Sequence, residues 1–252
     1  MSALRRVQEA LPAVARTGRR IAASGAAAAG TVLRARRLQD GAGPESRREQ
    51  AVRLRDLLAR VTTLHGVEID VEGPVPTGAA VLASNHVSWL DPLVICGLVP
   101  CVPISKEAVA RWPVVGAVAR DLGVLFVERG NGRSGMRVLR GAARALEAGI
   151  SVLNFPEGTT TRGDGVLPFN AGLLGMARIA EAPIVPVAIS YDRPELAWVG
   201  DDTFLPHYLR FAGGGRSVAH VRFGAPIDAA RFGAGTDLAR SVRNAVASLL
   251  AS

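Results

Sequence analysis

The chain after residue 62 alternates between short β-branched runs and longer segments in which hydrophobic residues recur every three or four positions. The short runs predict strands, at residues 67–71, 79–83, 102–105, 124–127, 151–155, 184–189 and 218–223. The longer segments predict helices, at residues 92–99, 113–121, 133–148, 171–181 and 236–251. This alternation predicts an α/β fold, with a largely parallel mixed sheet flanked by helices. Pro186 favours an edge strand or a bulge for the run that contains it.

The first 62 residues carry a different pattern, in which helical spacing is combined with many arginines. One helix is predicted over residues 3–15 and a second over 44–64, each with an apolar side and a basic side. The Gly-rich stretch at 40–44 predicts a linker between the two helices. We therefore expect a basic amphipathic helical segment at 1–62, followed by an α/β domain at 63–252.

Positive charge is concentrated in the same N-terminal segment. Residues 1–60 hold 13 arginines and five acidic residues, a charge of +8, whereas the remaining residues are neutral overall. A basic arm on a neutral body predicts an anionic partner, either a membrane surface or nucleic acid. The neutral body and its scattered tryptophans argue against nucleic acid. Two alternatives stay open: helices that pack on the body with solvated arginines, and an organellar transit peptide.

Composition narrows the class of protein further. Apolar residues make up 48% of the chain, which excludes an intrinsically disordered protein. The longest apolar stretch, at 21–33, is shorter than the roughly 18 residues that a membrane span needs. Cys96 and Cys101 are too few for a disulfide scaffold and have no histidine near them in the sequence. We therefore expect a reduced cytosolic setting, buried thiols and no metal site.

A histidine and an aspartate follow the predicted strand at 79–83. His86 leaves the strand, and Asp91 comes five residues later, directly before Pro92. If the loop curls before the next helix, the carboxylate can hold the imidazole in one tautomer while the other ring nitrogen takes a proton. The alternative is structural, because an aspartate followed by proline is also a good helix N-cap.

Three further segments carry residues that need an explanation. Arg129 ends the segment 123–129, and we expect it at the same carboxyl edge of the sheet as His86. The turn Glu157-Gly158-Thr159 follows the predicted strand at 151–155. The last segment is the apolar strand with an internal proline, Val185-Pro186-Val187.

In this order the four segments resemble the 1-acylglycerol-3-phosphate O-acyltransferase family of membrane-associated glycerolipid acyltransferases. That family is marked by an N-H-x4-D block, a G-x-x-F-x-x-R block, an F-P-E-G-T block and a V-P-V-type strand. All four are present, at His86 and Asp91, at Gly123, Phe126 and Arg129, at Phe155 to Thr159, and at Val185 to Val187. The resemblance covers residues 65 to 225.

The resemblance implies transfer of a fatty acyl group from acyl-CoA or acyl carrier protein to the hydroxyl of 1-acylglycerol-3-phosphate, which forms phosphatidic acid in phospholipid biosynthesis. It implies His86 as the general base and Asp91 as its orienting partner. The polar head of the acceptor would be bound by Arg129, Glu157, Gly158 and Thr159. No metal is implied, and no cofactor besides the acyl thioester cosubstrate. We expect such an enzyme at the cytoplasmic face of the cell membrane, peripheral or monotopic on an anionic surface.

Lys106 is a further candidate for binding phosphate. It is the single lysine among 30 cationic side chains, and it follows the predicted strand at 102–105, between the first two family blocks. An ammonium at this position is unusual for this chain, so we expect Lys106 to contact a phosphate of the acceptor or of the donor.

The sequence departs from the pattern of phosphatidate-forming enzymes at two places. Thr160 and Thr161 follow the Glu-Gly-Thr turn where arginine is common, and Asn170 stands where lysine is frequent. Similar threonine-rich turns occur in relatives that acylate other lysolipids. An acceptor such as lyso-ornithine lipid therefore stays open, as does a non-catalytic member that binds lipid.

Overall fold

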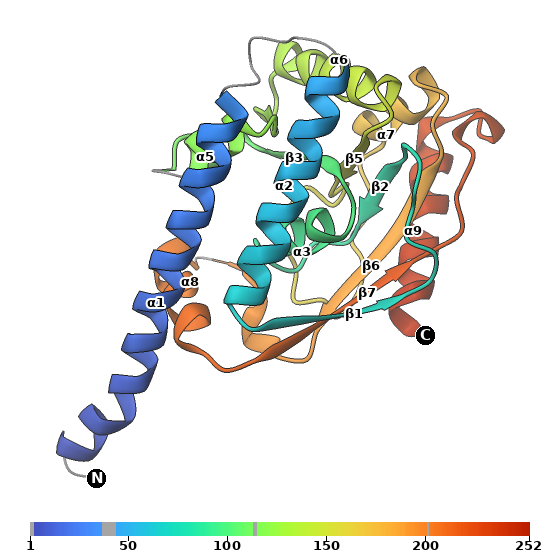
Figure 1. The fold of residues 1–252 in the computed structure, drawn as a ribbon. Coiled ribbons are helices and arrows are strands. Elements are labelled where there is room, and N and C mark those ends of the chain that lie inside the picture. The colour runs from blue at the N-terminus through green and yellow to red at the C-terminus, as the bar shows by residue number, and fades with distance from the viewer. Residues whose placement is uncertain (1–2, 37–43, 113–114, 201) are drawn as a thin grey trace.

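The computed structural model of the chain describes residues 3–36, 44–112, 115–200 and 202–252. Within these residues, seven strands form one sheet in the order β1-β7-β6-β2-β5-β3-β4 (Figure 1). The strands are β1 Val67–Glu72, β2 Val81–Ser84, β3 Cys101–Lys106, β4 Leu125–Val127, β5 Ser151–Asn154, β6 Ile184–Tyr191 and β7 Ser217–Phe223. Each lies at one of the predicted positions, so the predicted α/β class is confirmed.

The sheet is parallel except at one pair of strands. β6 and β7 are antiparallel, whereas the other neighbouring pairs are parallel. Strands β2, β3, β4, β5 and β6 therefore all end at the same edge of the sheet. The chain segments that follow these strands are brought together there.

The edge position expected for Pro186 is wrong, because β6 lies inside the sheet between β7 and β2. The bulge expected as the alternative is present on the facing chain, because Pro186 pairs with Gly224 but Ile184 pairs with Ile227, which leaves one extra residue opposite β6. The β6–β7 ladder begins at Val187 opposite Phe223, so Pro186 lies one residue beyond it. There the Gly224 N–H donates to the Pro186 carbonyl at 2.9 Å. Since proline has no N–H, only the return bond of that last rung is missing. A central strand accommodates proline at the point where its neighbour ends.

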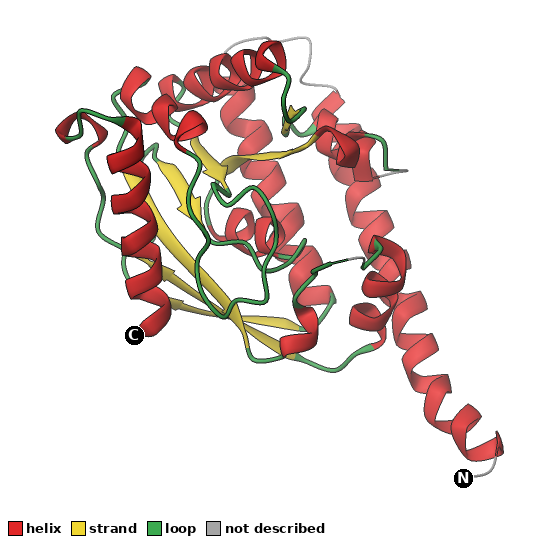
Figure 2. Ribbon diagram, turned by 180° about the vertical axis from the view of Figure 1, so that it is seen from behind, coloured by secondary structure: helices red, strands yellow, loops and turns green. Residues whose placement is uncertain are grey.

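Helices cover both faces of the sheet (Figures 1 and 2). One face is covered by α6 Gly132–Glu147, α7 Ala171–Ile179 and α9 Gly235–Ala251, and the other by α2 Pro44–Leu64 and α3 Asp91–Leu98. In β2, Val81 and Leu82 point into the two separate cores and neither is exposed. Strands buried on both faces explain the nearly continuous apolar runs in the sequence.

Some helices differ from the sequence prediction. The predicted helix at 113–121 is present as α5 Val115–Asp121, and its first two residues lie outside the described residues. The sequence pattern did not reveal α8 Phe204–Gly213, the short α4 Glu107–Ala110, or the 3-10 turns η1 Pro194–Leu196 and η2 Ala229–Arg231. In α8 the leucines Leu205 and Leu209 are exposed while His207 is buried, so its hydrophobic pattern does not match its buried side.

The N-terminal segment forms one long helix, α1 Ala3–Arg36, where the sequence predicted a helix only over 3–15. It packs on α2 and α8, and Arg20 fixes this contact. The Arg20 guanidinium donates to the carbonyls of Leu64, Ala212 and Gly214 at 3.1, 2.9 and 3.1 Å. Except for Pro44, the predicted linker at 40–44 lies outside the described residues, as do the side chains before residue 12. Among the described helices, none has the length and hydropathy of a membrane span.

Candidate active site

Polar side chains gather at the edge of the sheet where the parallel strands end. His86 follows β2, Lys106 ends β3, Arg129 follows β4, Glu157 follows β5, and Tyr191 ends β6. Four of these residues were predicted from sequence, and they follow or end the neighbouring strands β2, β5, β3 and β4 along one edge of the sheet. They are His86, Glu157, Lys106 and Arg129. Tyr191 was not predicted as part of this site.

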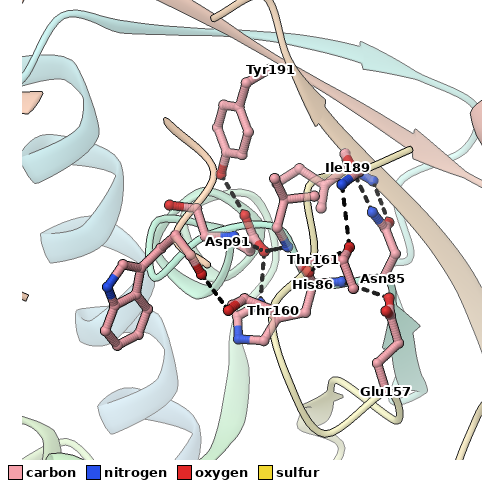
Figure 3. A network of polar contacts seen from close by, with 12 residues as sticks. Asn85, His86, Asp91, Glu157, Thr160, Thr161, Ile189 and Tyr191 are labelled. Atoms are coloured by element: carbon pink, nitrogen blue, oxygen red, sulfur yellow. Dashed lines mark hydrogen bonds and ion pairs between the residues drawn. The ribbon is translucent and has the colours of Figure 1, made fainter. Parts of the chain in front are cut away.

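His86 and Asp91 are in direct contact (Figure 3). The His86 Nδ1 lies 2.7 Å from Asp91 Oδ2, and the side chain of His86 is 19% exposed while that of Asp91 is fully buried. Because a carboxylate accepts, Nδ1 is the protonated nitrogen. The other ring nitrogen, Nε2, is then the one that can accept a proton from a substrate.

Asp91 is held by donors on both of its oxygens. Its Oδ2 also accepts from the backbone N–H groups of Val87 at 2.6 Å and Ser88 at 2.9 Å. Its Oδ1 accepts from the Tyr191 hydroxyl at 2.7 Å (Figure 3). Donors to the charged form stabilise a buried carboxylate. Burial, and then the charge of Asp91, raises the pKa of Tyr191 well above its usual value, so Tyr191 remains a donor.

The alternative in which Asp91 serves as a helix N-cap does not describe this geometry. The N-cap position of α3 is Leu90, and Asp91 is the first residue of the helix. The carboxylate turns back to the loop at 86–88 and does not bond an N–H of the helix. Asp91 thus fixes the loop and the imidazole.

Contacts of Asn85 and Phe155 hold the loop that carries His86 against the sheet. The Asn85 side chain accepts from the Ile189 N–H and donates to the Ile189 carbonyl, both at 2.9 Å. The Phe155 ring stacks on the His86 imidazole, with ring centroids 4.0 Å apart. These contacts connect the histidine to β6 and to the end of β5.

Glu157 faces the backbone of the same loop. Its Oε1 accepts from the His86 N–H at 3.0 Å, and its Oε2 accepts from the Leu167 N–H at 3.4 Å. Burial raises the pKa of the Glu157 carboxyl, although these two backbone bonds act in the opposite direction. The sequence resemblance placed Glu157 at the acceptor's polar head, whereas the structure brings its carboxylate to the backbone of His86.

The two threonines that depart from the family pattern also contact this loop. The Thr161 N–H donates to the His86 carbonyl at 2.8 Å, and the Thr161 hydroxyl donates to the same carbonyl at 3.3 Å. The Thr160 hydroxyl donates to the Trp198 carbonyl, and the Trp198 N–H donates to the Val87 carbonyl at 2.9 Å. These threonines therefore link the turn after β5 to the loop that carries His86.

A cationic pocket lies beside the turn. It has a volume of about 240 Å³ and is lined by Lys106, Glu107, Ala108, Arg111, Val127, Glu128 and Arg129. Burial, and then the charge of Arg129, lowers the pKa of the Lys106 ammonium. Gly158 has a φ of +72°, and a Cβ on it would lie 3.7 Å from Arg129 Nη2. The pocket therefore joins Lys106 and Arg129 to the Gly158 turn, with Thr159 exposed beside it.

Sequence reasoning missed Arg111 and Tyr191. Arg111 follows α4, a four-residue helix that no hydrophobic period indicates. Tyr191 contacts a residue 100 positions away, and only the pairing of β6 with β2 brings it there. Neither residue falls within a family block.

The two cysteines are buried free thiols, with sulfur atoms 3.0 Å apart. Burial raises the pKa of the Cys96 thiol well above its usual value. Within the described ranges, no group of three or more histidine, cysteine, aspartate or glutamate side chains could hold a metal ion.

Comparison with known proteins decides the family. An acyltransferase family model matches residues 67–190. A lyso-ornithine lipid O-acyltransferase of Pseudomonas aeruginosa is 35% identical over 194 residues, which cover 75% of this chain and 74% of that protein. The chain belongs to the acyltransferase family. The resemblance inferred from the four sequence blocks is thereby confirmed.

Further relatives of the acyltransferase differ in their named acceptor. A 1-acyl-sn-glycerol-3-phosphate acyltransferase of Neisseria meningitidis is 34% identical over 175 residues, which cover 66% of this chain and 68% of that protein. A solved structure of a 1-acyl-sn-glycerophosphate acyltransferase from Thermotoga maritima is 23% identical, with a TM-score of 0.68 over 98% of this chain and 96% of that one. The acyltransferase thus shares its fold with that structure. The predicted enzyme class, glycerolipid O-acyltransferase, is confirmed. The relatives do not identify its acceptor, because some are named for lyso-ornithine lipid and others for 1-acyl-sn-glycerol-3-phosphate.

Proposed function

We propose that the acyltransferase transfers a fatty acyl group from acyl-CoA or acyl carrier protein to the hydroxyl of 1-acylglycerol-3-phosphate and forms phosphatidic acid. The observation that carries this proposal is the His86–Asp91 pair at the same sheet edge as the cationic pocket. The pair supplies a base for a hydroxyl group. The pocket supplies Lys106, Arg111 and Arg129 for a phosphate.

The reaction requires the acceptor hydroxyl to lose its proton as it attacks the thioester carbonyl. His86 Nε2 takes that proton while the new C–O bond forms, and Asp91 stabilises the imidazolium. The tetrahedral intermediate then collapses, the C–S bond breaks, and the leaving thiolate takes the proton from His86. Tyr191 holds the second oxygen of Asp91 and is a positioning residue in this scheme. The N–H groups of Val87 and Ser88 are bonded to Asp91, so the oxyanion must be stabilised by other donors.

The pocket residues bind the phosphate of the acceptor. The planar guanidinium of Arg129 provides paired donors that suit phosphate oxygens, and Lys106 adds a compact charge. The turn at Gly158 and Thr159 borders the pocket, where its backbone can approach a headgroup closely. Glu157 acts indirectly, because its carboxylate fixes the N–H of His86.

Lyso-ornithine lipid is a second candidate acceptor, and three observations favour it. The Pseudomonas aeruginosa relative carries that name, and Thr160 and Thr161 bond backbone carbonyls at a place where an arginine would add positive charge. Glu107 and Glu128 also line the pocket and could pair with an ammonium group.

An acylation assay distinguishes these functions. Release of free thiol is measured with two donors, acyl-CoA and acyl carrier protein thioester. Each donor is combined separately with 1-acylglycerol-3-phosphate, lyso-ornithine lipid and lysophosphatidylcholine. We expect the highest kcat/KM with 1-acylglycerol-3-phosphate. A higher value with lyso-ornithine lipid would replace the first acceptor by the second, and no turnover with any donor or lysolipid would indicate a non-catalytic lipid-binding protein.

The same assay tests the base. We expect His86→Ala to lower kcat at least a hundredfold, in keeping with the loss of a general base. His220→Ala is the matched control, because His220 forms a similar pair with Asp70 at 3.1 Å, both side chains are exposed, and the pair makes no contact with His86 or Asp91. A His86→Ala enzyme that kept a tenth of the wild-type rate would contradict the proposed mechanism.

We also propose that residues 1–62 hold the enzyme on the cytoplasmic face of the membrane. On α1 between residues 12 and 30, Arg19 is the single charged residue among those that are exposed. The other exposed residues on this stretch are Pro12, Val14, Ala15, Gly18, Ile21, Ala22, Gly25, Ala26, Ala29 and Gly30. Arg16 and Arg20 are partly covered instead, and Arg20 bonds the body of the enzyme. An exposed apolar helix face next to many arginines suits an anionic lipid surface.

A further inference from the structure

Helix α6 carries a row of arginines on its exposed side. Arg133, Arg137, Arg140 and Arg144 are all exposed, and the helix contains one acidic residue, Glu147, in its last turn. At 3.6 residues per turn, the four positions lie within about 60° of one another around the helix axis and span about 16 Å along it. They form one cationic face, which we call the α6 arginine face.

These arginines differ from those in the last part of the chain. Six of the seven arginines after residue 190 lie 3.6 Å or less from a carboxylate, namely Arg193, Arg210, Arg216, Arg222, Arg231 and Arg240. Among the described residues, no carboxylate lies within ion-pair distance of the four arginines on α6. Arg137 donates to the Ser134 hydroxyl at 3.2 Å, which leaves its charge uncompensated.

The position of the face relates it to the candidate active site. α6 begins five residues after the end of β4, so Arg133 lies close in sequence to the pocket residue Arg129. From there the row runs along the sheet face that α6, α7 and α9 cover, whereas α2, on which α1 packs, covers the opposite face (Figures 1 and 2). A partner bound along α6 therefore reaches the active-site edge at the N-terminal end of the helix, on the face of the sheet opposite the one that α2 and α3 cover.

We propose that the α6 arginine face docks a small acidic protein that carries the acyl group as a thioester, namely acyl carrier protein. This inference rests on the proposed acyl transfer and adds the identity of the donor. Four unpaired charges spread over about 16 Å match a row of carboxylates on a protein surface better than the clustered phosphates of one CoA molecule. A bilayer is disfavoured because the apolar face of α1 lies on the other side of the sheet.

Comparison of two donors tests this docking surface. The full-length enzyme is assayed with palmitoyl-CoA and with the palmitoyl thioester of a purified bacterial acyl carrier protein, using the acceptor with the highest kcat/KM. The test variant combines Arg140→Gln with Arg144→Gln. Neither arginine lines the cationic pocket. The control is Arg231→Gln with Arg240→Gln, which removes the same charge from two other exposed arginines.

We expect the test variant to raise the KM for the carrier-protein donor about fivefold to tenfold, because two favourable surface charge pairs are lost. The KM for palmitoyl-CoA and both values for the control should stay within about twofold of wild type, the ordinary effect of a surface change. Added salt should reduce the difference between wild type and test variant.

Three results would overturn the docking surface. They are an equal rise in KM for both donors, an unchanged KM for the carrier-protein donor, and a wild-type enzyme that accepts only palmitoyl-CoA. If the wild-type enzyme acylates no lysolipid with either donor, the proposed function itself fails, and the docking proposal fails with it.

Discussion

Asp91 is a fully buried carboxylate that accepts from three groups besides His86, and this explains how a charge can be kept inside the protein. An isolated ionised carboxylate would be strongly destabilising there. Two of the donors are backbone N–H groups of the same loop, so the carboxylate orders the loop and the loop stabilises the carboxylate. The imidazole is thereby held in one orientation before any substrate binds.

The contact between Tyr191 and Asp91 gives a prediction at this scale. In Tyr191→Phe the buried Oδ1 of Asp91 loses its donor, and a hydrogen bond to a charged group is worth about 1.5–3 kcal/mol. We expect kcat to fall about tenfold to a hundredfold while the KM for the acceptor changes less than about threefold, since the phosphate pocket is untouched.

Tyr208→Phe is the matched control for this substitution. Its hydroxyl lies 3.1 Å from His65 Nε2, outside the candidate active site. Tyr191 and Tyr208 are the two tyrosines of the sequence. We expect Tyr208→Phe to keep at least half of the wild-type kcat, even if its melting temperature falls as far as that of Tyr191→Phe. Equal losses of kcat in the two variants would show that Tyr191 acts only through general stability.

Single residues were predictable where the chemistry is local in sequence. His86 and Asp91 are five positions apart, and one loop is enough to bring them together. Tyr191 and Arg111 depend on strand order and on a four-residue helix, which leave no local signal. The inward orientation of Glu157 also depends on tertiary structure, because it bonds an N–H that is 71 positions away.

At the scale of elements, the strands were predictable because a sheet buried on both faces requires short apolar runs. The same reasoning was wrong in expecting an edge position for Pro186, since it considers one strand and ignores where the neighbouring strand ends. α8 was missed because two of its leucines face outward, against the usual pattern of an amphipathic helix. Its buried side is formed by His207, Phe211 and Ala212, which give no clear period in the sequence.

The link between the loop after β2 and strand β6 gives a prediction for this scale. Asn85→Ala leaves the Ile189 N–H and carbonyl unpaired at a buried position. An unsatisfied buried group costs about 1–3 kcal/mol, so we expect the free energy of unfolding to fall by about 2–4 kcal/mol. Chemical denaturation followed by circular dichroism measures this change.

Asn244→Ala provides the comparison for Asn85→Ala. Asn244 is exposed on α9 and makes one long contact with Arg243, at 3.4 Å. We expect its unfolding free energy to remain within about 0.5 kcal/mol of wild type. If Asn85→Ala were equally mild, the loop would be held mainly by the contacts of Glu157 and Thr161.

At the scale of the whole molecule, the charge map located the N-terminal segment but did not show its orientation. The sequence predicted a basic and an apolar side for a helix at 3–15, and its arginines lie outside the described side chains. In the part of α1 between residues 12 and 30, Arg16 and Arg20 are partly covered and the exposed side is apolar apart from Arg19. The sequence did not reveal this because the partners of Arg20 are carbonyl groups near residues 64 and 212.

The exposed face of α1 gives a prediction for membrane binding. Val14 and Ile21 are 67% and 46% exposed, and changing both to glutamate places two negative charges on the proposed lipid-facing side. We expect sedimentation with anionic vesicles to fall about tenfold or more, because burying apolar side chains and attracting anionic lipids both become unfavourable. Deleting residues 1–62 would be a poorer test, since Leu54 and Leu57 of α2 are buried in the body.

The control for this prediction is Met136→Glu with Ile179→Glu. These side chains are 51% and 66% exposed, and they lie on α6 and α7, which cover the other face of the sheet. We expect this control to bind vesicles within about twofold of wild type. Equal losses in the two double variants would mean that net charge, and not the face of α1, determines binding.

The bonds from Thr160 and Thr161 to the loop that carries His86 have a consequence for how such an enzyme can change its substrate. The segment that departs from the pattern of phosphatidate-forming enzymes is thus also a support of the base. Exchanging these residues to redirect the enzyme toward another lipid would therefore slow it as well, and recovering speed would require compensating changes elsewhere. Selectivity and turnover in this protein should evolve together.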